Sequence, residues 1–174
     1  MTIMPRGSDQ LLLPVNPFFI AFTLAVAASV NMLPLGRQPA MPDLLAVALV
    51  FWNVHQPRRI GVGVAFMFGL VMDVLESAML GQHALAYTAL SFFATMIHRR
   101  LLWFTVPSQA LQVLPLFALA HGVELVIRMI GGGIFPGWIM LLAPLIEALL
   151  WPVVSVILLA PQRRAPDPDQ NRPL

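Results

Sequence analysis

The sequence has no cysteine, and charged residues make up only 10% of its 174 residues. Without cysteine the chain can form neither a disulfide framework nor a thiolate metal site. Its ten basic residues are all arginine, and no basic run is interleaved with aromatic residues, so nucleic acid is not an expected partner. The motifs H-E-x-x-H, G-x-S-x-G and G-x-x-x-x-G-K-[ST] are also missing. We therefore expect a protein that is not an enzyme and that uses no cofactor.

Apolar residues are abundant instead. They make up 59% of the sequence and give a mean hydropathy of +0.81. A soluble domain of this length cannot bury so much apolar surface, so a lipid bilayer is the expected solvent. The sequence predicts an all-α, polytopic membrane protein with a membrane domain at 16–160, a cytoplasmic N-terminal segment at 1–15 and a disordered cytoplasmic tail at 161–174. The expected bundle has six transmembrane helices, at 16–35, 42–55, 60–79, 82–98, 107–129 and 138–159.

The arginines favour one orientation of these spans. With six spans both termini lie on the same side, and short loops rich in arginine are usually cytoplasmic. Only Arg37 and Arg128 fall on the side opposite the termini. We therefore expect both termini in the cytoplasm. The other eight arginines fall on the side of the termini: Arg6, Arg58, Arg59, Arg99, Arg100, Arg163, Arg164 and Arg172.

Ionisable residues within the spans gather toward the outer side. A charged group at the centre of a bilayer costs about 2.5–3.5 kcal/mol on insertion scales, so each one is expected to have a partner. At about 1.5 Å of rise per residue, Asp73 lies roughly 20 Å from the cytoplasmic start of its helix. The inner half of the bundle is then expected to be almost purely apolar. Glu147 is expected near the middle of its helix. The other outer candidates are Glu76, His83, His121, Glu124 and Arg128, of which the stripe His121, Glu124 and Arg128 is the predicted partner of Asp73.

Small residues recur every four positions before Asp73, at Gly61, Ala65 and Gly69. Such a ridge lets another helix approach closely, so it predicts that Asp73 faces protein rather than lipid. Packing within the chain is the more common use of this spacing, and a dimer seam is the alternative.

The polar residues also have ordinary structural interpretations. Glu124 and Arg128 have the spacing of an intrahelical ion pair with the acid first, which favours a neutralising role. His121 and Glu124 could contribute to a metal site, but no second ligand motif accompanies them, so no metal is expected. His83 begins a helix, where a hydrogen-bonded role is more common than proton transfer.

Two neighbouring motifs support a family resemblance. The first is Gly69-Leu70-x-x-Asp73, and the second is Leu80-Gly81-x-His83-x-Leu85-x-Tyr87. With the chain length, the six predicted spans and the short loops, these motifs resemble the bacterial rod shape-determining protein family MreD. Glu76 and Ser77 depart from the family pattern, in which a small residue or glycine often stands.

The resemblance implies a non-enzymatic subunit of the cell-elongation machinery in the inner membrane. Such proteins work beside the bitopic partner MreC and the actin-like MreB, and bear on the peptidoglycan synthase RodA and its transpeptidase. The family is also similar in fold to the substrate-binding S-components of energy-coupling-factor vitamin transporters. The spacing Ala21-x-x-x-Ala25 resembles the helix-docking motif of those components.

Two functions follow as hypotheses. In the first, the chain is a membrane scaffold, surrounded by lipid, whose small-residue ridges and outer charges bind an MreC-like helix or a second copy of the chain. Asp73→Leu or Gly69→Leu would then weaken partner binding. In the second, the chain is the substrate-binding subunit of a small-molecule importer. Its outer pocket would be lined by Asp73, His83, His121, Glu124 and Glu147.

Overall fold

The computed structural model describes residues 15–33 and 40–162; most of the predicted N-terminal segment and tail, and Arg37 with its loop, lie outside these residues. Within the two ranges the chain has six α-helices, two short 3₁₀ helices and no β-strand, which confirms the all-α class. The 3₁₀ helices η1 (Trp138–Leu141) and η2 (Ala160–Gln162) flank the last α-helix. The α-helices are α1 (Pro17–Asn31), α2 (Leu44–His55), α3 (Val62–Leu75), α4 (Gln82–Leu101), α5 (Val106–Ile130) and α6 (Leu142–Leu159).

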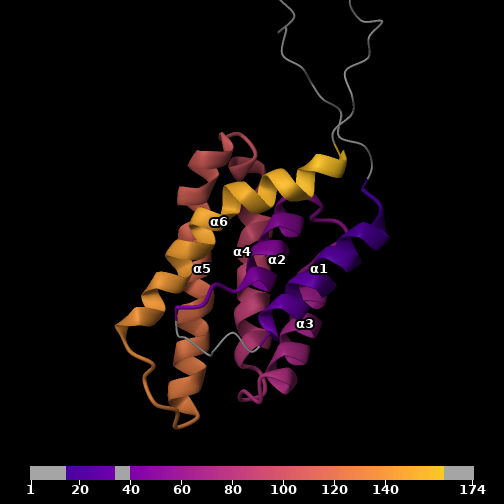
Figure 1. Cartoon of the computed structure of the whole chain (residues 1–174). Coiled ribbons are helices and arrows are strands. Elements are labelled where there is room, and N and C mark those ends of the chain that lie inside the picture. Colours follow the sequence, from indigo (N-terminus) through magenta and orange to yellow (C-terminus); the bar gives the residue numbers. More distant parts are fainter. Residues whose placement is uncertain (1–14, 34–39, 163–174) are drawn as a thin grey trace, which may run out of the picture.

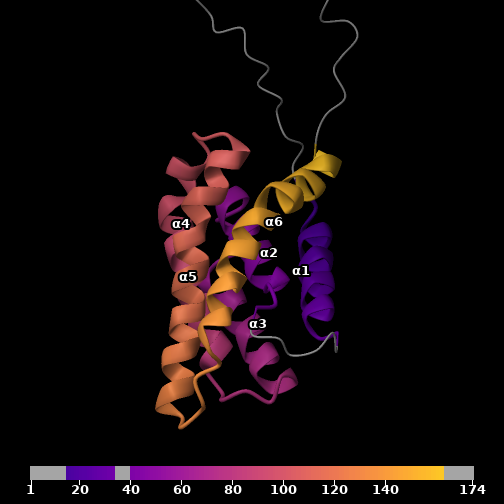
Figure 2. The ribbon, with the colours of Figure 1, turned by 60° about the vertical axis from the view of Figure 1, so that its left-hand side comes forward.

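The helices differ in how well they could cross a membrane. Val106–Ile130 and Trp138–Gln162 are long and apolar enough to do so, whereas α1, α2 and α3 are shorter apolar helices. The number of spans therefore stays a prediction. The start of α1 and the end of α6 lie at the same end of the bundle in both views (Figures 1 and 2).

The short helix α2 is the centre of the bundle. All ten of its residues from Leu45 to Val54 are buried, because α1, α4 and α6 pack around it (Figures 1 and 2). Phe51 and Trp52 are among the largest side chains of the core. The indole N–H of Trp52 donates a 2.9 Å hydrogen bond to the hydroxyl of Thr23 on α1. A helix of twelve residues is thus stabilised by packing on several sides.

The helix pair α3–α4 is held together by the small-residue ridge. A Cβ atom at Gly69 would lie 2.4 Å from the Cα of Ala84, a distance that no side chain can occupy. Ala65, one turn earlier, is also fully buried, whereas Gly61 is the N-cap of α3 and is only partly covered. The ridge therefore serves packing within the chain, and its central positions are covered by α4.

Large apolar side chains cover the outside of the bundle. Those that are more than half exposed include Phe22 on α1, Met67 on α3, Leu111 on α5 and Leu149 on α6. Soluble monomers rarely expose apolar side chains over so many faces. The distribution suits a protein whose surroundings are hydrocarbon.

Candidate functional site

Asp73 closes the turn between α3 and α4. One of its oxygens, Oδ2, accepts a 2.7 Å hydrogen bond from the backbone N–H of Gly81, and Oδ1 accepts one of 2.7 Å from that of His83. The carboxylate therefore satisfies unpaired donors at the N-terminus of α4, where negative charge is favoured. Gly81 has a φ of +99°, which suits glycine, and Leu80 beside it is 70% exposed at the tip of the turn.

The imidazole of His83 lies between two carboxylates. Its Nδ1 is 2.9 Å from Oδ1 of Asp73, and its Nε2 is 3.6 Å from Oε2 of Glu76. His83 and Asp73 are both buried, and the His83 ring is a further hydrogen-bond partner of the Asp73 carboxylate. The partners of Asp73 are thus in its own hairpin, and the prediction that the stripe on α5 pairs with it is wrong. Helical spacing shows which residues share a face, but it does not identify the neighbouring helix.

A second histidine, His121 on α5, has a matching arrangement. Its Nε2 is 2.8 Å from Oε1 of Glu147 on α6, and its Nδ1 is 3.5 Å from Oε2 of Glu124 one turn along. Glu147 is fully buried, and its second oxygen, Oε2, has no hydrogen-bond partner. The polar stripe of α5 therefore binds α5 to α6.

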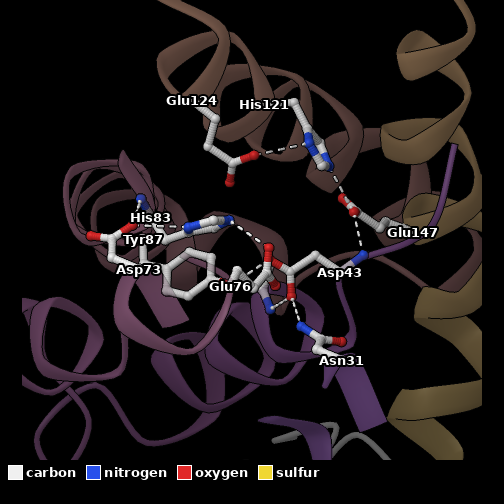
Figure 3. Close-up of polar contacts among 10 residues, drawn as sticks. Asn31, Asp43, Asp73, Glu76, His83, Tyr87, His121, Glu124 and Glu147 are labelled. Carbon is white, nitrogen blue, oxygen red and sulfur yellow. Dashed lines mark hydrogen bonds and ion pairs between the residues drawn. The ribbon is translucent and has the colours of Figure 1, made fainter. Parts of the chain in front are cut away.

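Asp43, the N-cap of α2, connects Glu147 of this second group to Tyr87 and Asn31, and it was not foreseen as a site residue (Figure 3). Its Oδ1 accepts a 2.6 Å hydrogen bond from the amide of Asn31 and one of 2.9 Å from the N–H of Ala46. Its Oδ2 accepts a 2.6 Å hydrogen bond from the hydroxyl of Tyr87. Its own N–H donates to Oε1 of Glu147 at 2.8 Å. Asp43 thereby ties α2 to α1, α4 and α6.

The sequence does contain a signal that Asp43 is an N-cap residue. Aspartate immediately before an apolar helical run is a preferred N-cap residue. The expected start at residue 42 placed Asp43 inside the helix, so its side chain was not considered as a hydrogen-bond acceptor.

Arg128 does not form the expected intrahelical pair. In the described part of the chain it makes no ion pair with Glu124, whose carboxylate faces His121 instead. Arg128 is in the last turn of α5, and its stem lies so close to Gly133 that a Cβ there would be 2.7 Å from Cγ. It borders an open pocket of about 480 Å³ between the α3–α4 turn and the end of α5, together with Glu76, Gln82 and His83.

The half of the bundle away from the α3–α4 turn, which is expected to be almost purely apolar, also contains a polar group. The amide of Asn53 on α2 donates to the hydroxyl of Ser91 on α4 at 2.9 Å, and the hydroxyl of Thr95 donates to Asn53 Oδ1 at 3.3 Å. These side chains are neutral and paired, so they are tolerated in an apolar interior.

We give the name outer polar cluster to the acidic and histidine side chains described above for Asp43, Asp73 and His121 and their partners, together with Asn31 and Tyr87. Its members come from all six helices or their caps, and most of their polar atoms are used by one another: Asn31, Asp43, Asp73, Glu76, His83, Tyr87, His121, Glu124 and Glu147 (Figure 3). No group of three or more histidine and acidic side chains within the described ranges is arranged to hold a metal ion. The contacts are those of a network that fixes helix ends.

Comparison with known proteins shows to which family the chain belongs. Residues 10–160 match the model of a family described as rod shape-determining protein MreD. The chain belongs to the MreD family. The rod shape-determining protein MreD of Haemophilus influenzae (strain ATCC 51907 / DSM 11121 / KW20 / Rd) is 30% identical over 145 residues, which cover 81% of this chain and 85% of that protein. No solved structure matches the chain.

Membership in the MreD family confirms the resemblance carried by residues 69–87 and identifies a rod shape-determining membrane protein. The MreD family is not a known enzyme family, and it generally functions with the MreC and MreB shape machinery. The likeness to energy-coupling-factor S-components stays a prediction.

Proposed function

We propose that this MreD-family chain is a multi-pass scaffold of the inner membrane, with both termini in the cytoplasm, that binds an MreC-like one-span partner through the exposed face of α1. In this role it supports peptidoglycan synthesis during elongation by holding its partners in one membrane complex. The shared position of the start of α1 and the end of α6 supports placing both termini on one side of the membrane (Figures 1 and 2), and the distribution of arginines favours the cytoplasmic side.

The observation that carries the proposal is the exposure of the small residues of α1. Ala21, Ala25 and Ser29 are exposed and recur every four residues, next to Phe18 and Phe22, which are 81% and 64% exposed. The hydroxyl of Ser29 donates to the carbonyl of Ala25 at 2.8 Å, so it presents no unpaired donor to lipid. Small residues at this spacing allow close approach of a second helix in a membrane.

The other surfaces considered from the sequence are less suitable for a partner. The central positions of the α3 ridge, Ala65 and Gly69, are buried against neighbouring helices. Asp73 and Glu147 are likewise buried and bonded to residues of the chain. A partner could reach them only by separating helices that are already packed.

The same contacts favour the scaffold over the importer. A ligand site needs polar groups that converge on open space. Of the five residues nominated for it, only His83 borders the outer pocket, and its ring nitrogens already face Asp73 and Glu76. The remaining four bond to one another or to helix ends, and only Oε2 of Glu147 is buried without a hydrogen-bond partner.

Cell shape provides the functional test. In a bacterium depleted of its own copy, the wild-type chain should restore rod-shaped cells, and Ala25→Leu should leave them round because the added side chain prevents helix contact. Ala118→Leu, at an exposed position on α5, is the matched control and should restore rods. Immunoblots of membranes must show equal amounts of the three proteins. Full restoration of shape by Ala25→Leu would reject the proposed surface.

A further inference from the structure

A groove runs between α1 and α3 on the side of the bundle away from α5. Helix α1 packs on α2 and α3 packs on α4, which leaves about 500 Å³ of open space between α1 and α3. Ile20 and Leu24 form one wall, and Val64 and Phe68 form the other. At about 1.5 Å per residue, the stretch from Pro17 to Leu24 makes the groove roughly 10 Å long. An apolar space of this size in a membrane is expected to be filled, because a void loses the contacts of its lining atoms.

A single guanidinium stands at the end of the groove where both helices begin. Arg59 borders the groove, and none of the residues that line it is acidic. One of its nitrogens, Nη1, donates to the carbonyl of Val15, which fixes the side chain beside the start of α1. Because a guanidinium has five N–H donors, others remain for a second acceptor. The planar fork of donors matches the geometry of a phosphate.

The position of this guanidinium favours a lipid of the cytoplasmic leaflet. Arg58 is next to it in sequence and exposed, and both precede α3 at the end of the bundle where α1 begins. On the orientation proposed above, that end faces the cytoplasmic leaflet, whose anionic lipids are attracted by basic residues. Basic pockets between transmembrane helices on this side are typical sites for anionic head groups.

We propose that the α1–α3 groove binds one acyl chain of an anionic phospholipid, whose phosphate contacts Arg59. The apolar walls hold the chain, and the guanidinium selects the charge of the head group. The site adjoins the partner face of α1. Ala21 borders both, whereas Ile20 and Leu24 line the groove and Phe22 and Ala25 lie on the exposed face outside it.

The test uses the full chain, without any partner, in detergent micelles that contain dioleoyl phosphatidylglycerol or dioleoyl phosphatidylcholine. Native mass spectrometry should show wild-type protein retaining phosphatidylglycerol at several times the level of phosphatidylcholine. Arg59→Gln should abolish this preference. Ala21→Phe, which fills the groove without changing its charge, should reduce retention of both lipids. Arg99→Gln, an exposed arginine that does not border the groove, is the control and should behave as wild type.

Circular dichroism of each variant must show the wild-type helix content, and Ala21→Phe gives a second reading if Arg59→Gln does not fold. Equal retention of the two lipids by wild type would overturn the proposal. Undiminished preference in Arg59→Gln would do the same. Cross-linking of a partner helix to Val64, on the α3 wall of the groove, with no phospholipid retained by the isolated chain, would show that the groove is a protein site instead. Because no partner is needed, a failure here is separate from a failure of the scaffold function.

Discussion

The hydroxyl of Tyr87 donates a 2.6 Å hydrogen bond to Oδ2 of Asp43, 44 residues earlier in the chain. Tyr87 is fully buried on α4 and Asp43 is the N-cap of α2, so this bond joins the N-terminal parts of α2 and α4. It lies at the centre of the outer polar cluster (Figure 3).

Tyr87→Phe should remove this bond while keeping the ring in place. Hydrogen bonds to charged groups contribute about 1.5–3 kcal/mol in soluble proteins, and interhelical ones in membranes average roughly 0.6 kcal/mol. We expect the free energy of unfolding to fall by about 1–2 kcal/mol. Unfolding by SDS in mixed micelles measures the change. Ser108→Ala, which removes an exposed hydroxyl at the start of α5, should have no measurable effect.

Gly69→Ala should destabilise the chain, because its new Cβ would overlap the backbone of Ala84 and push α4 away from α3. Overpacking of a core costs about 1–3 kcal/mol, and backbone cannot yield as a side chain can. The matched control is Gly63→Ala in the same helix, where a Cβ would meet no atom within 4 Å. It should leave the unfolding free energy unchanged or raise it by up to about 1 kcal/mol. Equal effects of the two substitutions would contradict the close contact.

Asp73→Asn should act on folding rather than on partner binding. The carboxylate accepts hydrogen bonds from the N–H groups of Gly81 and His83 and from the His83 ring, and an amide retains only one oxygen acceptor. We expect a loss of about 1–3 kcal/mol of unfolding free energy. If Asp73→Asn keeps its stability but no longer co-purifies with a partner, the prediction is contradicted and Asp73 has a role in partner binding.

Glu147→Gln and Glu147→Leu should differ. Glutamine keeps an oxygen for the N–H of Asp43 and for His121, and it removes any charge from a fully buried group, so its cost should stay below about 1 kcal/mol. Leucine leaves both partners unpaired, which costs about 2–4 kcal/mol. SDS titrations of the two variants against wild type provide the comparison. A loss for glutamine as large as that for leucine would show that the negative charge itself is needed.

The helices and the location of the charged residues could be predicted from the sequence, because both depend on local patterns. Apolar runs bounded by glycine, proline and arginine marked six helices to within a few residues. At the end of α3 the expected bound is four residues too late, because the helix stops at Leu75, where the carboxylate of Asp73 turns back to bind the next helix.

The partners within the outer polar cluster could not be predicted, because they depend on which helices become neighbours. Spacing placed His121 and Glu124 on one face of a helix, but it gave no indication that this face meets Glu147. The role of α2 was likewise hidden. Its length suggested a weak span, whereas its burial on several sides follows only from the packing of α1, α4 and α6.

The most direct test of partner binding through α1 is co-purification of an MreC-like protein with tagged wild type, Ala25→Leu and Ala118→Leu, normalised to the amount of each variant. We predict that Ala25→Leu binds about tenfold less partner than wild type does, which is equivalent to roughly 1.4 kcal/mol of binding free energy. Its unfolding free energy should be unchanged. Ala118→Leu should retain wild-type amounts. Wild-type recovery of the partner with Ala25→Leu would contradict a binding surface on α1.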